Sequence, residues 1–232
     1  MARWRFLPVI VFSLVASAAT AATPSVGTLV EEGWRIQERW RAVTEKGSFR
    51  YDFRLRTWNG DNRVKEDIER VAVVEASGGQ SRSEILVARK DGHDELEKAR
   101  EEEARRRRKP AEKRESFPSP FDPKYRDRYQ FAVAAGEAGP QLVFRPFSPF
   151  EGSIAGRAHY DPAGKLRRVE FTLARPRFYT KNLAFAISLD EEGNPARVES
   201  SGLVTLVVWK RRFESELTVT DVRPAPPSTA SP

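Results

Sequence analysis

The chain has 232 residues, no cysteine, and 40 Lys and Arg against 33 Asp and Glu, which gives a formal net charge of +7. Without cysteine it can form no disulfide, use no thiolate in catalysis, and carry no lipid on a cysteine after a leader. The charge is spread through a sequence that is 31% charged rather than gathered in one domain. We therefore expect no nucleic-acid partner, whereas peripheral attraction to an anionic membrane surface stays open.

Residues 1–22 have the pattern of a secretory signal peptide. Two arginines precede an apolar run over residues 6–15, and Ala19-Thr20-Ala21 forms a small-x-small cleavage signal. The apolar run is well short of the roughly 18 to 20 residues that span a bilayer, which favours cleavage over a membrane anchor. We expect an exported, soluble protein with one domain over residues 23–223.

The first element of this domain is predicted to be a helix over residues 28–46. Thr28 and Glu31 have the spacing of a capping box, in which both side chains satisfy free backbone N–H groups at a helix start. Leu29, Ile36, Trp40 and Val43 then form an apolar stripe, and Trp34 lies beside it. This stripe is expected to cover a sheet.

A three-stranded meander follows. Residues 48–58 alternate strictly, with Phe49, Tyr51, Phe53 and Leu55 on one side of a strand and charged residues on the other. Asn59-Gly60 is typical of a type I′ hairpin turn, and further strands are predicted over residues 67–76 and 83–89.

Residues 91–115 are a charged helical insert. Glu101, Glu102 and Glu103 stand four residues before Arg105, Arg106 and Arg107, the spacing of ion pairs on a helix. The segment has almost no apolar residue to bury, so we expect a solvated helix that ends near Pro110. The basic cluster over residues 105–109 is better explained as a solvated helix face than as a binding site.

The rest of the chain is predicted to be strands. The clearest unit is a hairpin over residues 152–174, where Val169, Phe171 and Leu173 alternate with polar residues after the turn Asp161-Pro162-Ala163-Gly164-Lys165. The predicted strands cover residues 129–133, 141–147, 153–160, 166–173, 183–189, 196–200, 203–209 and 216–222. Residues 224–232 are rich in Pro, Ala and Ser and are expected to be disordered. The expected fold class is mainly β (α+β), an antiparallel meander curled into an unclosed or half β-barrel, with an N-terminal helix and a second charged helix.

No residue pattern points to catalysis. The two histidines, His93 and His159, do not have metal-ligand spacing, and the sequence lacks zinc-protease, nucleophile-elbow, P-loop and dinucleotide-binding motifs. A carboxylate pair of the glycosidase type is the one chemistry that the sequence leaves open. We expect no enzyme activity, no metal and no cofactor.

Bulky apolar residues on the strands instead predict an apolar groove. A sheet covered by little more than one helix leaves part of its apolar face open to a ligand, although an ordinary packed core accounts for each residue taken alone. The candidate ligand-binding residues are Trp34, Trp40, Phe49, Tyr51, Phe53, Leu55, Phe171, Phe185 and Ile187.

The order of these elements, with the connector Phe121-Asp122-Pro123 and the hairpin GRAHYDPAGKLRRVEF, resembles the LolA/LolB-like superfamily of periplasmic outer-membrane lipoprotein carriers. The resemblance covers the whole mature chain. It implies an unclosed barrel with a helical lid that holds acyl chains of lipids or lipoproteins, in a soluble periplasmic monomer that acts as a carrier or sensor at the cell envelope. The alternative is a structural module of the envelope that binds other envelope proteins and no lipid. A third alternative, an integral outer-membrane barrel, fits poorly because a helix and a charged insert interrupt the strands.

Overall fold

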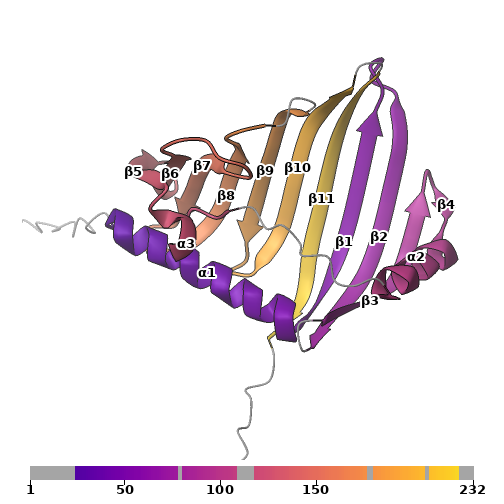
Figure 1. Ribbon diagram of the computed structural model, residues 1–232. Helices are drawn as coiled ribbons and strands as arrows, with labels where there is room; N and C mark the ends of the chain where they lie inside the picture. The colour runs from indigo at the N-terminus through magenta and orange to yellow at the C-terminus, as the bar shows by residue number, and fades with distance from the viewer. Residues whose placement is uncertain (1–23, 78–79, 109–117, 177–179, 207–208, 225–232) are drawn as a thin grey trace, which may run out of the picture.

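The computed structural model describes residues 24–77, 80–108, 118–176, 180–206 and 209–224. Eleven antiparallel strands form one sheet in the order β4-β3-β2-β1-β11-β10-β9-β8-β7-β6-β5, which does not close on itself (Figure 1). This confirms the expected fold class. The helices are α1 (Val26–Lys46), α2 (Leu96–Arg108) and α3 (Pro123–Arg126), and the strands are β1 (Ser48–Trp58), β2 (Val64–Ser77), β3 (Gln80–Lys90), β4 (His93–Asp94), β5 (Tyr129–Gly136), β6 (Gly139–Pro146), β7 (Ile154–Tyr160), β8 (Leu166–Leu173), β9 (Thr180–Leu189), β10 (Pro195–Leu206) and β11 (Trp209–Arg223).

The pairing of β1 with β11 joins the two halves of the chain. Strands β2 to β4 continue the sheet on one side of this seam, and β10 back to β5 continue it on the other, each strand next to its neighbour in sequence. The whole sheet is therefore a meander except at the seam, where the first strand meets the last.

Helix α1 begins one turn earlier than the capping box predicted. Its N-cap is Ser25, whose backbone is extended and whose hydroxyl accepts a hydrogen bond from the Thr28 amide at 3.2 Å. Both residues can cap a helix, and the earlier one does so here. Thr28 itself lies inside the first turn, so the predicted role of its side chain is wrong.

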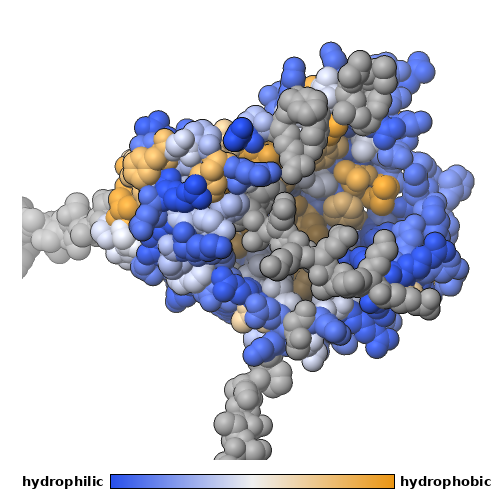
Figure 2. Space-filling view, in the orientation of Figure 1, coloured by the Kyte–Doolittle hydropathy of each residue, from blue (hydrophilic) through white to orange (hydrophobic). Residues whose placement is uncertain are grey.

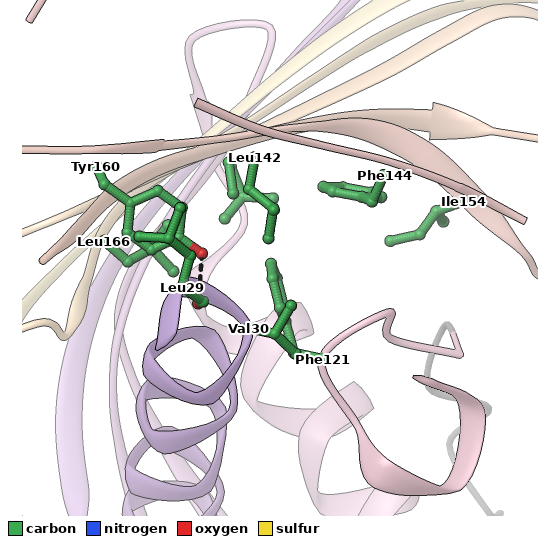
Figure 3. Close-up of a cluster of buried hydrophobic side chains, with 10 residues drawn as sticks. Leu29, Val30, Phe121, Leu142, Phe144, Ile154, Tyr160 and Leu166 are labelled. Atoms are coloured by element: carbon green, nitrogen blue, oxygen red, sulfur yellow. Dashed lines mark hydrogen bonds between the residues drawn. The ribbon is translucent and has the colours of Figure 1, made fainter. Parts of the chain in front are cut away.

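The main core lies between the N-terminal half of α1, the connector that carries Phe121, and strands β5 to β8 (Figure 3). Leu29 of α1 and Leu142 of β6 are completely buried. The Tyr160 hydroxyl donates to the Leu29 carbonyl oxygen at 2.7 Å, and burial, with a contribution from Glu32, raises the pKa of this tyrosine. The core therefore fixes α1 across one end of the sheet.

Helix α2 is docked on the sheet, which corrects the expectation of a solvated helix. Ala99 is 4% exposed and packs with Leu96 against a second buried cluster on β2 and β3, namely Ala72, Ile85 and Ala88. Burial opposes ionisation of Glu103, but hydrogen bonds from Arg106 and Arg107 outweigh it and lower the pKa of this carboxyl. The helix carries almost no large apolar side chain. Its inner face can nevertheless be buried, because Ala99 is small and the charge of Glu103 is paired with two arginines.

Two predicted turns differ from the structure. The segment 196–200 and the start of 203–209 belong to one strand, β10, whose pairing with β9 is irregular between Ser201 and Leu203. In the β1–β2 connection the positive φ of 60° belongs to Asn62 rather than to Asn59 or Gly60, so the connection is not the predicted type I′ turn. The turn before β8 is as predicted, with Gly164 at φ 78°.

Several predictions concern segments outside the described residues. These are the signal peptide over residues 1–22, the last part of the charged insert, and the tail from residue 225. Within the described ranges, none of the helices is both long enough and apolar enough to span a membrane.

Candidate binding face

One face of the sheet, which we call the apolar face, carries a continuous row of apolar side chains across five strands. Each residue of this row is directly opposite the next one on the neighbouring strand. From β1 through β11, β10 and β9 to β8, the row consists of Phe53, Leu217, Val198, Ile187 and Val169. Strict alternation along each strand puts the side chains of such partners on the same face.

A second row lies beside it, and its two polar side chains hydrogen-bond each other. It consists of Leu55, Ser215, Ser200, Phe185 and Phe171. The hydroxyls of Ser200 and Ser215 are 2.7 Å apart and hydrogen-bond each other. The rings of Phe171 and Phe185 stack, with centroids 5.0 Å apart and planes 15° apart. The row therefore keeps an apolar character despite its two serines.

The helices cover this face mainly at its two ends. Helix α1 packs on β1 to β3 at its C-terminal end and on β5 and β8 near its N-terminal end, while α2 packs on β3. Within the described ranges, β9, β10 and β11 have no comparable helix packing. Figure 2 shows apolar side chains recessed near the strands that Figure 1 labels β11 and β1, with hydrophilic side chains around them. The side chains of the first row are half-buried except for Val169, which is buried.

The structure divides the nine predicted residues into two groups. Trp34 packs against the main core, Trp40 and Phe49 contact each other with ring centroids 5.2 Å apart, and Tyr51 packs against the cluster beneath α2. The remaining five belong to the two rows, and these are Phe53, Leu55, Phe171, Phe185 and Ile187, of which Phe171 also packs against the main core.

Sequence reasoning missed the residues that connect the two sides of this surface. Val198, Leu217 and Val169 complete the first row, and Ser200 and Ser215 complete the second. Each lies at an alternating position of its strand, so the sequence alone shows on which strand face it lies. The strand register that brings them together is not a local property of the sequence.

The opposite face, which we call the charged face, holds a groove of about 810 Å³ that extends from β1 to β7. Four ion pairs form a chain across it. Arg168 pairs with Glu170 at 2.8 Å and with Glu199 at 3.5 Å. Arg197 pairs with Glu199 at 3.1 Å and with Glu216 at 3.0 Å. These pairs are partly exposed, so each adds little to stability. They nevertheless leave the groove lined by alternating charges.

Two carboxyl groups on the charged face have lowered rather than raised pKa values. The hydrogen bond from Arg168 is the main cause that lowers the pKa of Glu170, and hydrogen bonds from Arg54 and Arg56 lower that of Asp67. A glycosidase acid instead needs a raised pKa. The described residues also contain no cluster of His, Asp and Glu that could hold a metal ion.

Comparisons with known proteins leave the family open. No family model and no curated protein matches the chain. Among solved structures, a chain of the Pseudomonas aeruginosa MucA/MucB complex matches over 82% of this chain and 94% of its own length, with 10% sequence identity and a TM-score of 0.21. A likeness this low carries no functional argument, and the resemblance to the LolA/LolB-like superfamily is not confirmed by it.

Proposed function

We propose that this protein is an exported, non-catalytic binding protein that holds an acyl chain of a lipid or lipoprotein on its apolar face at the cell envelope. The observation that supports this is the first row, where five apolar side chains on five neighbouring strands lie in line. Four of the five are half-buried in the free chain.

The dimensions of the row fit a long acyl chain. Five strands at a spacing of about 4.8 Å extend over about 19 Å from the first to the last. Burying a 14-carbon chain at about 0.8 kcal/mol per CH₂ contributes about 11 kcal/mol before the cost of association. Since association costs at least several kcal/mol, we expect a dissociation constant in the micromolar range.

A second candidate function is binding of an envelope protein, and the charged face supports it. The ion pairs around Arg168 and Arg197 line a groove that offers both signs of charge to a polar partner. Such a partner would bind without an acyl chain and would leave the apolar face unchanged.

The test compares two substitutions on the same strand. Ile187 belongs to the first row, and its neighbour Ala186 lines the groove on the charged face. We expect fatty acids or diacyl lipids at about 100 times their dissociation constant to raise the unfolding free energy by about 2.7 kcal/mol, a melting shift of about 5 to 10 °C. Ile187→Gln should weaken binding by about tenfold or more, and Ala186→Gln should not.

Native mass spectrometry of protein isolated from the envelope provides an independent measurement. A bound lipid that is lost in Ile187→Gln but kept in Ala186→Gln would support the proposal. If no lipid co-purifies and no fatty acid, phospholipid or acylated peptide changes the melting temperature, acyl-chain binding is refuted. The protein-binding function then takes its place.

A further inference from the structure

The two edges of the open sheet are protected very differently. At one edge, α2 covers the outward carbonyl groups of β3: Arg100 donates to Ile85 at 3.3 Å, Arg107 donates to Ser83, and the Glu95 amide donates to Ala88 at 2.9 Å. The short strand β4 pairs with the end of β3. These contacts occupy the backbone groups through which another strand could add.

The other edge is β5, and within the described ranges no helix side chain and no further strand occupies its outward backbone groups. The strand Tyr129–Gly136 reads YQFAVAAG, with no charged residue and no proline. Phe131 and Val133 pack toward the main core, and the intervening Ala132 and Ala134 are exposed. An apolar patch is visible in Figure 2 at the end of the sheet where Figure 1 labels β5. Proteins usually place lysine, proline or a bulge on such an edge to prevent pairing.

Two prolines of the neighbouring strand show which backbone groups of β5 point outward. Pro146 is opposite Tyr129 and Pro140 is opposite Ala135. Proline has no N–H, so these are the non-hydrogen-bonded pairs of the β5–β6 ladder. Phe131 and Val133 are an even number of residues from Tyr129 and Ala135, so they too belong to non-hydrogen-bonded pairs. Their N–H and C=O groups therefore point away from the sheet. Outside the ladder, the described residues provide no hydrogen-bond partner for them.

We propose that β5 pairs antiparallel with β5 of a second copy of this chain, about a two-fold axis at Ala132. This register places Phe131 opposite Val133 of the partner subunit, so that the outward backbone groups of both residues bond each other. Ala132 then faces the same residue of the other copy in a non-hydrogen-bonded pair. Because the axis is normal to the sheet, both apolar faces lie on the same side of the joined sheet.

The charges and apolar side chains at the ends of β5 favour this occupant. Arg128 precedes the strand and Glu137 follows it, both are exposed, and neither has an ion pair among the described residues. Antiparallel pairing brings each arginine close to the glutamate of the other copy. Phe147, 68% exposed, donates its amide to the Arg128 carbonyl from the β6 side and adds exposed apolar surface near this end of β5. A strand of eight residues buries less than the roughly 1,200 Å² of a standard interface, so the dimer should be reversible.

The absence of native cysteine permits a direct test by cross-linking. In the proposed register the two copies of Ala132 have Cα atoms about 4.5 Å apart, within disulfide range, so Ala132→Cys should form a covalent dimer under mild oxidation. Ala134→Cys is the matched control, because Ala134 is also exposed and lies on the same strand face. Its two copies lie four residues apart along the strands, about 13 Å, which is too far for a disulfide.

Sedimentation velocity of the full mature chain at rising concentration gives the second measurement. We expect the wild type to show a reversible dimer, and Ala132→Lys, which brings two like charges together, to remain monomeric with unchanged circular dichroism. Equal cross-linking of both cysteine variants would overturn the register. A wild type that stays monomeric at about millimolar concentration, with no cross-linking of Ala132→Cys, would overturn the proposal and leave the edge to an extended segment of another protein.

Discussion

Substitution of Gly33 by alanine should destabilise the protein, although alanine is the better helix former. In an exposed helix interior the change gains about 0.8 to 1.0 kcal/mol. Here a Cβ atom would lie 2.5 to 2.8 Å from three ring carbons of Phe121, against about 3.5 to 4.0 Å for an ordinary carbon contact. Phe121 is 5% exposed and packs against Phe144, so its ring has little room to move. Overpacking of this kind costs about 1 to 3 kcal/mol.

Gly27→Ala is the control in the same helix. A Cβ there has only the Ser25 hydroxyl within 4 Å, at 3.8 Å, so the helix gain should appear without a clash. The two unfolding free energies from urea titrations followed by circular dichroism should differ by about 1 to 3 kcal/mol, with Gly33→Ala the less stable. Gly33→Ala should cost less in a Phe121→Leu background, because the smaller side chain leaves space. If both alanine variants stabilise the fold equally, the packing of α1 on Phe121 is wrong.

Two further predictions concern the core and α2. Tyr160→Phe removes the hydrogen bond to Leu29 and should cost about 0.5 to 1.5 kcal/mol near neutral pH. Because burial raises the pKa of Tyr160, its contribution is complete below about pH 10 and is lost as pH rises above that value, so wild type should lose more stability than Tyr160→Phe on going from pH 9 to 11 in urea titrations. Ala99→Glu buries an unpaired charge beneath α2 and should cost about 1 to 3 kcal/mol, whereas Ala104→Glu, exposed on the same helix, should cost less than about 0.5 kcal/mol. Equal effects of the two glutamates would mean that α2 is not docked.

The sequence predicted those elements whose pattern is local. Strands β1 and β8 have the predicted bounds because bulky apolar residues alternate with polar ones along most of β1 and from Val169 onward in β8. The break expected near Gly202 was wrong for a tertiary reason. A Cβ at this glycine would lie 2.9 Å from the Phe213 ring of β11, so the residue fits a close contact between strands rather than a turn.

The docking of α2 and the composition of the apolar face could not be read from local pattern. Ala99 gives almost no hydrophobic signal, yet a small side chain suffices where a helix lies close to a strand. The placement of Val198 beside Leu217 depends on the register of β10 with β11. Five of the nine predicted residues lie on the two rows because strict alternation identified their strand face. The residues next to them on this face belong to neighbouring strands, and the sequence does not show which strands pair with each other.

The seam between β1 and β11 also determines when the sheet can be completed. Residues near Ser48 pair with residues near Arg223, so almost the whole domain must be present before these two strands meet. During synthesis, the N-terminal block of α1 and β1 to β3 has an unpaired edge at β1 until the last strand emerges. Contacts between such distant parts of a chain slow folding, because the entropy of closing the intervening loop is lost first. A chain that ends before β11 would therefore retain two open edges in its middle, which makes truncated products of this protein prone to aggregation.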